Sequence, residues 1–173
     1  MGDAGVFADP DDPAQGLMFD GRTAENFKLT SGTWVHVGEL RVAIIAACAP
    51  LLQDTVIAGH DRDSLGALLF LNPAACVAAC PDLADKGVAL AVLTMRPEIV
   101  GAIKEALARH NAANPASSRR IARAVFLVAP PSIDGGEITD KGYINQRAVL
   151  DNRADDVAAL FADEPDSHVL ILD

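Results

Sequence analysis

A single lysine in a short polar loop is the residue best placed to do chemistry in this chain. The loop reads Thr139-Asp140-Lys141-Gly142-Tyr143, and residues with a helical pattern follow it. An ammonium group on such a loop supplies a mobile cation with several hydrogen bonds where negative charge develops in a reaction. On composition alone, the same lysine can equally be the exposed side chain of an ordinary turn.

Two further polar segments lie near the start of the chain. Arg22 follows a glycine, and Ser31-Gly32-Thr33 precedes Trp34, the only tryptophan. An arginine can make paired hydrogen bonds with an anion, a carboxylate such as that of Asp3 accepts hydrogen bonds, and a glycine adopts backbone angles that other residues resist. If these residues bind no ligand, Arg22 is an ordinary surface arginine, Asp3 is an inert terminal residue, and residues 31–33 form a simple hairpin turn.

The histidines and cysteines form no recognisable site. The four histidines are scattered, and no serine stands in a Gly-x-Ser-x-Gly elbow. The three cysteines lie among small apolar residues and are predicted to be buried hydrophobic side chains rather than disulfide partners. No further ligand stands at zinc spacing, so we expect no metal-ligating residues. The cysteines are Cys48, Cys76 and Cys80.

Composition predicts a globular protein with few classes of partner. Half of the 173 residues are hydrophobic, which is enough for one domain with its own core. The net charge is −10, and no stripe of basic residues is present, so we expect no binding to nucleic acid. The longest apolar stretches, 42–49 and 65–71, are too short to span a bilayer, and the first residues lack a signal peptide. A cytoplasmic protein without a membrane partner is expected.

The elements that must position these residues alternate between strands and helices. Strands are expected at 55–58, 66–71, 121–129 and 168–172, and helices at 38–49, 73–80, 97–114 and in one or two segments after 148. Residues 17–19 and 27–29 are expected to pair as a hairpin. This pattern predicts an α+β fold, in which a β-hairpin precedes a small mixed sheet with packed helices.

Taken in their order along the chain, the polar segments resemble the C-terminal domain of the adenylate-forming acyl- and aryl-CoA ligases, the AMP-binding superfamily. The resemblance is closest to the feruloyl-CoA synthetase branch. The resemblance is strongest at residues 16–41 and 136–150. It implies that residues 1–15 are the residual end of an N-terminal adenylation domain with its linker, and that residues 16–173 are a mobile C-terminal domain.

The resemblance also implies an activity. The complete enzyme would use ATP, CoA and Mg²⁺ to convert a small aryl or acyl carboxylate into an acyl-CoA through an acyl-adenylate. This chain would partner the N-terminal adenylation domain, bind no cofactor tightly by itself and be inactive when isolated. The alternative is a stand-alone binding module that keeps the fold without catalysis.

Individual residues take roles from the same resemblance. Met1-Gly2-Asp3 resembles the end of a Thr-Gly-Asp motif, so Asp3 is implied to hold the ribose of the adenylate. Arg22 matches the Gly-Arg hinge motif, where it can reach ribose or phosphate. Ala24 stands at the hinge itself, where relatives usually carry aspartate or lysine. Ser31, Gly32 and Thr33 resemble the loop that lines the CoA (pantetheine) tunnel.

The lysine loop departs from the family pattern at one position. Thr139, Asp140, Lys141 and Gly142 fit the first four places of Thr-x-x-Gly-Lys, and Tyr143 occupies the fifth, where the catalytic lysine normally stands. Either Lys141 delivers the ammonium from two residues earlier, or adenylation is weakened, because a tyrosine hydroxyl carries no formal charge. We predict that Lys141 is catalytic and that the loop is mobile in the isolated domain.

Overall fold

A four-stranded mixed sheet forms the centre of the protein. The computed structural model describes residues 3–7, 9, 11–22, 25–83 and 87–172. The strand order is β5-β6-β7-β8, in which β6 and β7 run parallel and the two outer strands are antiparallel to their neighbours. The strands are β5 (Leu52–Ala58), β6 (Leu65–Leu71), β7 (Ile121–Phe126) and β8 (Val169–Ile171). The small mixed sheet that the sequence predicts is confirmed.

Strand β6 lies inside the molecule and is buried on both faces. All seven of its residues are buried, as expected of a strand with an unbroken apolar sequence. Side chains alternate along a strand. Leu65, Ala67 and Leu69 therefore join one core cluster, while Leu68 and Phe70 join the other. A strand of this kind requires a layer of helices on each side.

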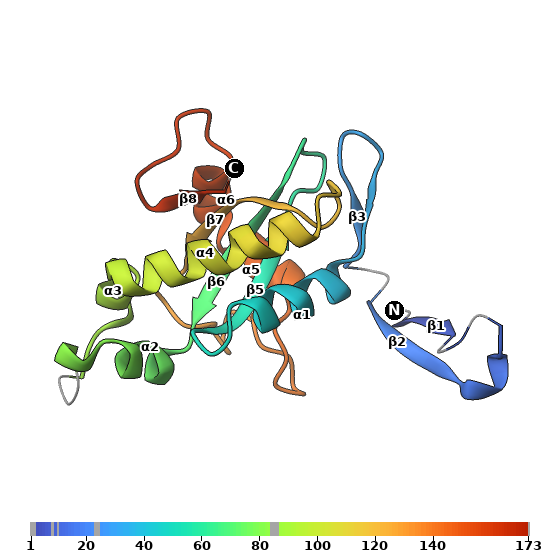
Figure 1. The fold of residues 1–173 in the computed structure, drawn as a ribbon, viewed down its shortest axis with the longest axis horizontal. Helices are drawn as coiled ribbons and strands as arrows, with labels where there is room; N and C mark the ends of the chain where they lie inside the picture. Colours follow the sequence, from blue (N-terminus) through green and yellow to red (C-terminus); the bar gives the residue numbers. More distant parts are fainter. Residues whose placement is uncertain (1–2, 8, 10, 23–24, 84–86, 173) are drawn as a thin grey trace.

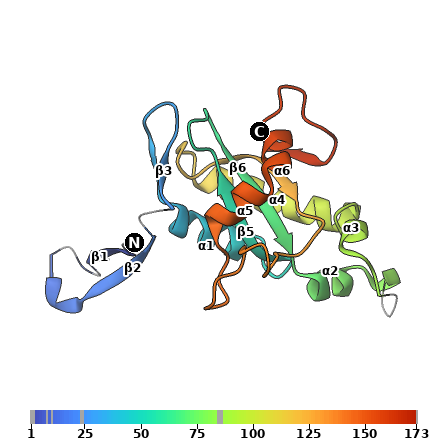
Figure 2. The ribbon, with the colours of Figure 1, turned by 180° about the vertical axis from the view of Figure 1, so that it is seen from behind.

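Helices supply both layers. Helices α1 (Val37–Ala47) and α4 (Pro97–Ala113) cover one face, and α5 (Gln146–Asn152) and α6 (Ala154–Leu160) cover the other (Figures 1 and 2). The connection from β6 to β7 also contains α2 (Pro73–Ala79), the 3₁₀ turn η2 (Pro81–Leu83) and α3 (Leu90–Leu93). No helix in the described ranges is both long enough and apolar enough to cross a membrane.

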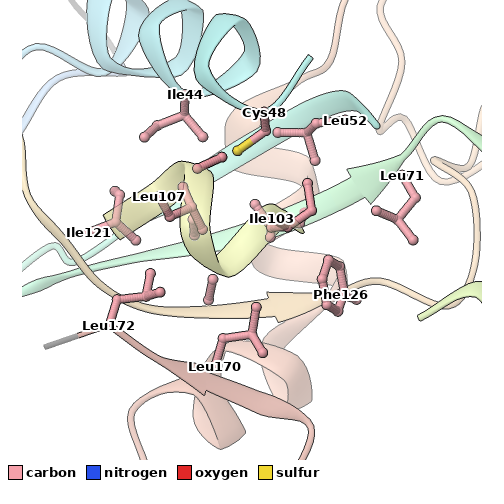
Figure 3. Close-up of a cluster of buried hydrophobic side chains, with 14 of the residues drawn as sticks. Ile44, Cys48, Leu52, Leu71, Ile103, Leu107, Ile121, Phe126, Leu170 and Leu172 are labelled. Atoms are coloured by element: carbon pink, nitrogen blue, oxygen red, sulfur yellow. The ribbon is translucent and has the colours of Figure 1, made fainter. Parts of the chain in front are cut away.

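The larger core cluster lies between the sheet and the helices α1 and α4. Ile103 and Leu107, one helical turn apart on α4, point toward the sheet beside Cys48 (Figure 3). All three cysteines are buried, as predicted, and burial raises the pKa of the Cys48 thiol to about 11. The last turn of α4 is joined to β7 because the Asn111 amide donates to the Ile121 carbonyl at 2.7 Å and accepts from its N–H at 2.9 Å.

Two short hairpins precede the sheet, and one predicted pairing is wrong. Strand β2 (Leu17–Arg22) pairs with β1 (Asp3–Phe7), with the 3₁₀ turn η1 (Pro13–Gln15) between them. Strand β3 (Phe27–Lys28) pairs with β4 (Trp34–Val35). Residues 17–19 and 27–29 are therefore not partners of each other. Each segment pairs with a different strand, 17–19 with the preceding β1 and 27–28 with the following β4.

Substituting Gly66 with alanine tests the contact between β6 and α6. A Cβ atom there would lie 2.5 Å from Leu160 Cδ2 and 2.9 Å from Leu160 Cγ. Because Leu160 is fully buried, we expect the overpacked variant to lose about 1–3 kcal/mol of unfolding free energy in urea denaturation.

Gly101→Ala is the matched control. Gly101 lies in α4, and an added Cβ would meet nothing within 4 Å. Alanine has the higher helix propensity, so this variant should gain up to about 1 kcal/mol. Equal effects of the two substitutions would contradict the packing described for β6.

Candidate functional site

Lys141 lies at the apex of a short β-hairpin. The Thr139 N–H donates to the Tyr143 carbonyl, and the Gly142 N–H donates to the Thr139 carbonyl, both at 2.8 Å. Gly142 has a φ of +79°, the left-handed conformation that glycine adopts most readily. A tight turn followed by a left-handed glycine is a common hairpin connection. Asp140 and Lys141 are exposed, and Tyr143 is 62% exposed.

The base of the hairpin is closed by two further contacts. Ile138 and Ile144 form an antiparallel bridge, and the Asn145 N–H donates to the Glu137 carbonyl at 2.8 Å. The Asn145 side chain then caps α5 by accepting from the Ala148 N–H at 3.3 Å. The lysine loop thus leads directly into a helix, as the sequence predicts. We refer to residues 137–145 as the lysine hairpin.

Glu137 binds the neighbouring segments through a buried ion pair. Its side chain is 1% exposed and accepts two hydrogen bonds from the Arg153 guanidinium, both at 2.9 Å, and one from the Ser132 N–H at 2.7 Å. These donors, Arg153 first, hold the pKa of the Glu137 carboxyl below its ordinary value, although burial opposes them. The carboxylate is therefore ionised at neutral pH.

Gln146 fixes the other end of the lysine hairpin to the sheet. Its amide donates to the Ile57 carbonyl at 2.5 Å and accepts from the Ile57 N–H at 3.2 Å. The Gln146 side chain is buried, so these bonds satisfy four polar groups that would otherwise be costly to leave unpaired. Helix α5 therefore begins at a fixed place on β5.

The loop at residues 31–33 forms the tip of the β3–β4 hairpin. Gly32 has a φ of +81°, and the Ser31 and Thr33 hydroxyls lie 2.9 Å apart. The Thr30 N–H donates to the Arg62 carbonyl at 3.0 Å, which joins this hairpin to the β5–β6 connection. At the base of the hairpin, the Lys28 ammonium lies 5.5 Å from the centre of the Trp34 ring, so Trp34 lies against a cation on the surface of the domain.

The remaining predicted residues lie on the β1–β2 hairpin or just beyond it. Asp3 and Arg22 are partners in the register of the two strands, which places their backbones side by side. This proximity links two residues that sequence reasoning assigned independently to the nucleotide. Ala24, the predicted hinge residue, lies outside the described residues.

The predicted residues that the structure describes do not gather into one site within this domain. Lys141 lies in the segment before α5 that projects from one end of the molecule, whereas the loop at residues 31–33 lies at the opposite end (Figures 1 and 2). The β1–β2 hairpin extends to the side. The domain thus presents its candidate functional residues on separate surfaces.

Sequence analysis assigned no role to Glu137, Gln146 or Arg153. Glu137 and Gln146 lie close to the lysine loop in sequence, one on each side, and both are buried polar side chains. Arg153 is one of several arginines in the C-terminal third, and its sequence context does not distinguish it. Only the fold reveals that these three residues secure the loop.

Comparison with known proteins identifies one family. Residues 29–165 match the family described as the AMP-binding enzyme C-terminal domain. No curated protein matches the chain.

Solved structures share the fold. The adenylation domain of a carboxylic acid reductase from Mycobacterium chelonae has a TM-score of 0.66 at 21% identity, covering 94% of this chain. That of Segniliparus rugosus, solved with AMP and a carboxylic acid, has 0.65 at 18% identity and 92% coverage. The anthranilate CoA ligase AuaEII, solved with anthranoyl-AMP, has 0.54 at 21% identity and 92% coverage. The chain spans 23%, 22% and 25%, respectively, of the length of these structures.

Acid titration tests the ion pair of Glu137. A carboxyl group whose pKa is lowered in the folded state stabilises the fold above its unfolded pKa, and this contribution is lost as the pH falls through the folded value. Glu137→Gln should therefore be less stable than wild type at pH 7, and the difference should shrink as the pH falls below about 4.5. Urea denaturation of both proteins from pH 7 to pH 3 measures this difference. A difference that does not depend on pH would contradict the ion pair.

Proposed function

Since this chain belongs to the family of AMP-binding enzyme C-terminal domains, we propose that it is the mobile C-terminal domain of an ATP-dependent aryl-CoA ligase of the feruloyl-CoA synthetase type. Its partner is the N-terminal adenylation domain of the same enzyme, and its substrate is a small aryl or acyl carboxylate. The enzyme works in the cytoplasm. The observation that carries the proposal is an exposed lysine at the apex of a closed hairpin in a domain with the adenylating-enzyme fold.

Lys141 is the catalytic residue of the first half-reaction. A carboxylate oxygen of the substrate attacks the α-phosphorus of ATP, an acyl-adenylate forms, and the bond to pyrophosphate breaks. Negative charge builds on the phosphate oxygens and the departing pyrophosphate. An ammonium in contact with these oxygens lowers the barrier because it interacts more strongly with the transition state than with ATP. The exposed apex allows Lys141 to enter a site on another domain.

The loop formed by Ser31, Gly32 and Thr33 serves the second half-reaction. There the CoA thiol attacks the acyl-adenylate, a thioester forms and AMP leaves. An added Cβ at Gly32 would meet no atom within 4 Å, so there is open space beside the backbone for a thin pantetheine chain. Because this loop lies at the opposite end of the domain from Lys141, the two half-reactions use two orientations of the domain. Ala24 is proposed as the pivot between them.

Asp3 and Arg22 are proposed to hold the adenosine. Their adjacent backbone positions on β1 and β2 support the binding of one ligand by both residues, with a carboxylate for the ribose hydroxyls and a guanidinium for ribose or phosphate. Among the described residues, no group of three or more His, Cys, Asp or Glu side chains could hold a metal ion. In this proposal Mg²⁺ would be held by the ATP phosphates and would neutralise part of their charge.

Replacing Lys141 separates the two half-reactions. In the enzyme that joins this domain to its adenylation domain, Lys141→Ala should slow pyrophosphate release by about a hundred- to thousandfold, because one charged contact is lost from the transition state. Thioester formation from preformed acyl-adenylate should survive, since it uses the other surface. Pyrophosphate release with ferulate and ATP measures the first step, and acyl-CoA formation measures the second.

Tyr143→Phe is the control, because it removes a neutral hydroxyl from the same hairpin and should affect adenylation far less. If Lys141→Ala leaves adenylation intact, Lys141 is not the catalytic residue. Another lysine, such as Lys28, would then be tested in the same way.

A further inference from the structure

Glu137 is the only fully buried carboxylate among the side chains that the structure describes. Burying a charge is unfavourable unless it is paired and hydrogen-bonded. Even a well-paired buried ion pair often stabilises a fold no better than apolar side chains of similar size. Stability alone therefore does not explain the pair with Arg153. Its location in the fold indicates what else it does.

The pair joins the lysine hairpin to the helices beneath it. The Glu137 carbonyl accepts from Asn145 and closes the hairpin, while the carboxylate of the same residue reaches Arg153. Arg153 stands at the junction of α5 and α6, after the last residue of one helix and before the first of the other. A single residue thus transmits the orientation of the helix layer to the hairpin that carries Lys141.

Neighbouring contacts make this connection rigid. The Arg153 guanidinium also donates to the Pro130 carbonyl at 3.0 Å, and Asn152 donates to the Gly135 carbonyl at 2.8 Å. The segment that leads into the hairpin is therefore held at several points. In contrast, the hydrogen bonds that the structure describes for Thr139, Gly142 and Tyr143 stay within the hairpin. The orientation of the apex depends on its base.

We propose that Glu137 and Arg153 are positioning residues that aim Lys141 at the reacting phosphate. This inference rests on the proposed function. Two parallel hydrogen bonds between a guanidinium and a carboxylate fix direction as well as distance, which a lysine at position 153 could not do. A small tilt at the base is amplified at the apex, and a displacement of about 1 Å at a reacting centre can reduce the rate about a hundredfold.

Two variants and one matched control test the proposal. Glu137→Gln keeps the shape of the side chain and removes its charge, and Arg153→Lys keeps the charge and removes the paired geometry. The control is Asp54→Asn, which breaks the ion pair of Asp54 with Arg41 between β5 and α1. That pair also makes two hydrogen bonds, at 2.7 and 2.6 Å, and both of its side chains are 19% exposed.

The first readout is the order of the lysine hairpin and needs no catalysis. Amide hydrogen exchange at Thr139 and Asn145, whose N–H groups donate within the hairpin, should become at least about tenfold faster in both test variants relative to β7, because the base no longer holds the hairpin. Tyr143 is the only tyrosine, so its fluorescence quenching by acrylamide reports on the same hairpin. Asp54→Asn should leave both signals unchanged even if it lowers overall stability.

The second readout is catalysis by the enzyme that contains this domain. Glu137→Gln and Arg153→Lys should slow adenylation by roughly ten- to a hundredfold and spare thioester formation from preformed acyl-adenylate. In a Lys141→Ala background, Glu137→Gln should cause less than about a twofold further loss, because residues that act through one group are not additive.

The outcomes separate the two proposals. Unchanged exchange at the hairpin, or a full additional loss in the Lys141→Ala background, overturns the positioning role and leaves the role of Lys141 in place. Adenylation that survives Lys141→Ala overturns the proposed function, even where the hairpin loosens as expected.

Discussion

The burial of β6 on both faces is the constraint on which the rest of the structure depends. A strand without a polar face must be covered twice, so helices are required on each side of the sheet. The layer of α1 and α4 completes the larger core, and the layer of α5 and α6 completes the smaller one. Gly66 lets the second layer approach closely, since Leu160 occupies the space of its missing side chain. The lysine hairpin is carried by this second layer.

Amide side chains connect these layers to the sheet in two places. Asn111 pairs with both backbone polar groups of Ile121, and Gln146 does the same for Ile57. An amide carries a donor and an acceptor in the spacing of a peptide group, so it can replace a strand neighbour for one residue. These contacts fix where α4 ends and where α5 begins without requiring regular secondary structure.

Much of the fold could be predicted from the sequence because apolar runs and helix boundaries are local signals. The continuous apolar run predicted β6. The spacing of Ile99, Ile103 and Leu107 between Pro97 and Asn114 predicted α4. The partners of the N-terminal strands were not predictable, because β3 and β4 have only two residues each and carry little pattern. The bonds of Glu137 and Gln146 were not predictable either, since the sequence shows neither their burial nor their distant partners. Local motifs indicated where Lys141 lies, and tertiary contacts determine how it is held.

The bonds between Gln146 and Ile57 also affect how this domain behaves among copies of itself. β5 is the outermost strand of the sheet, so the backbone groups of Ile57 that face away from β6 would otherwise be open to a strand from another molecule. The Gln146 amide occupies them and blocks this pairing near the C-terminal end of β5. Losing this side chain would therefore expose the backbone groups of Ile57 at this edge, and aggregation during folding is the expected effect.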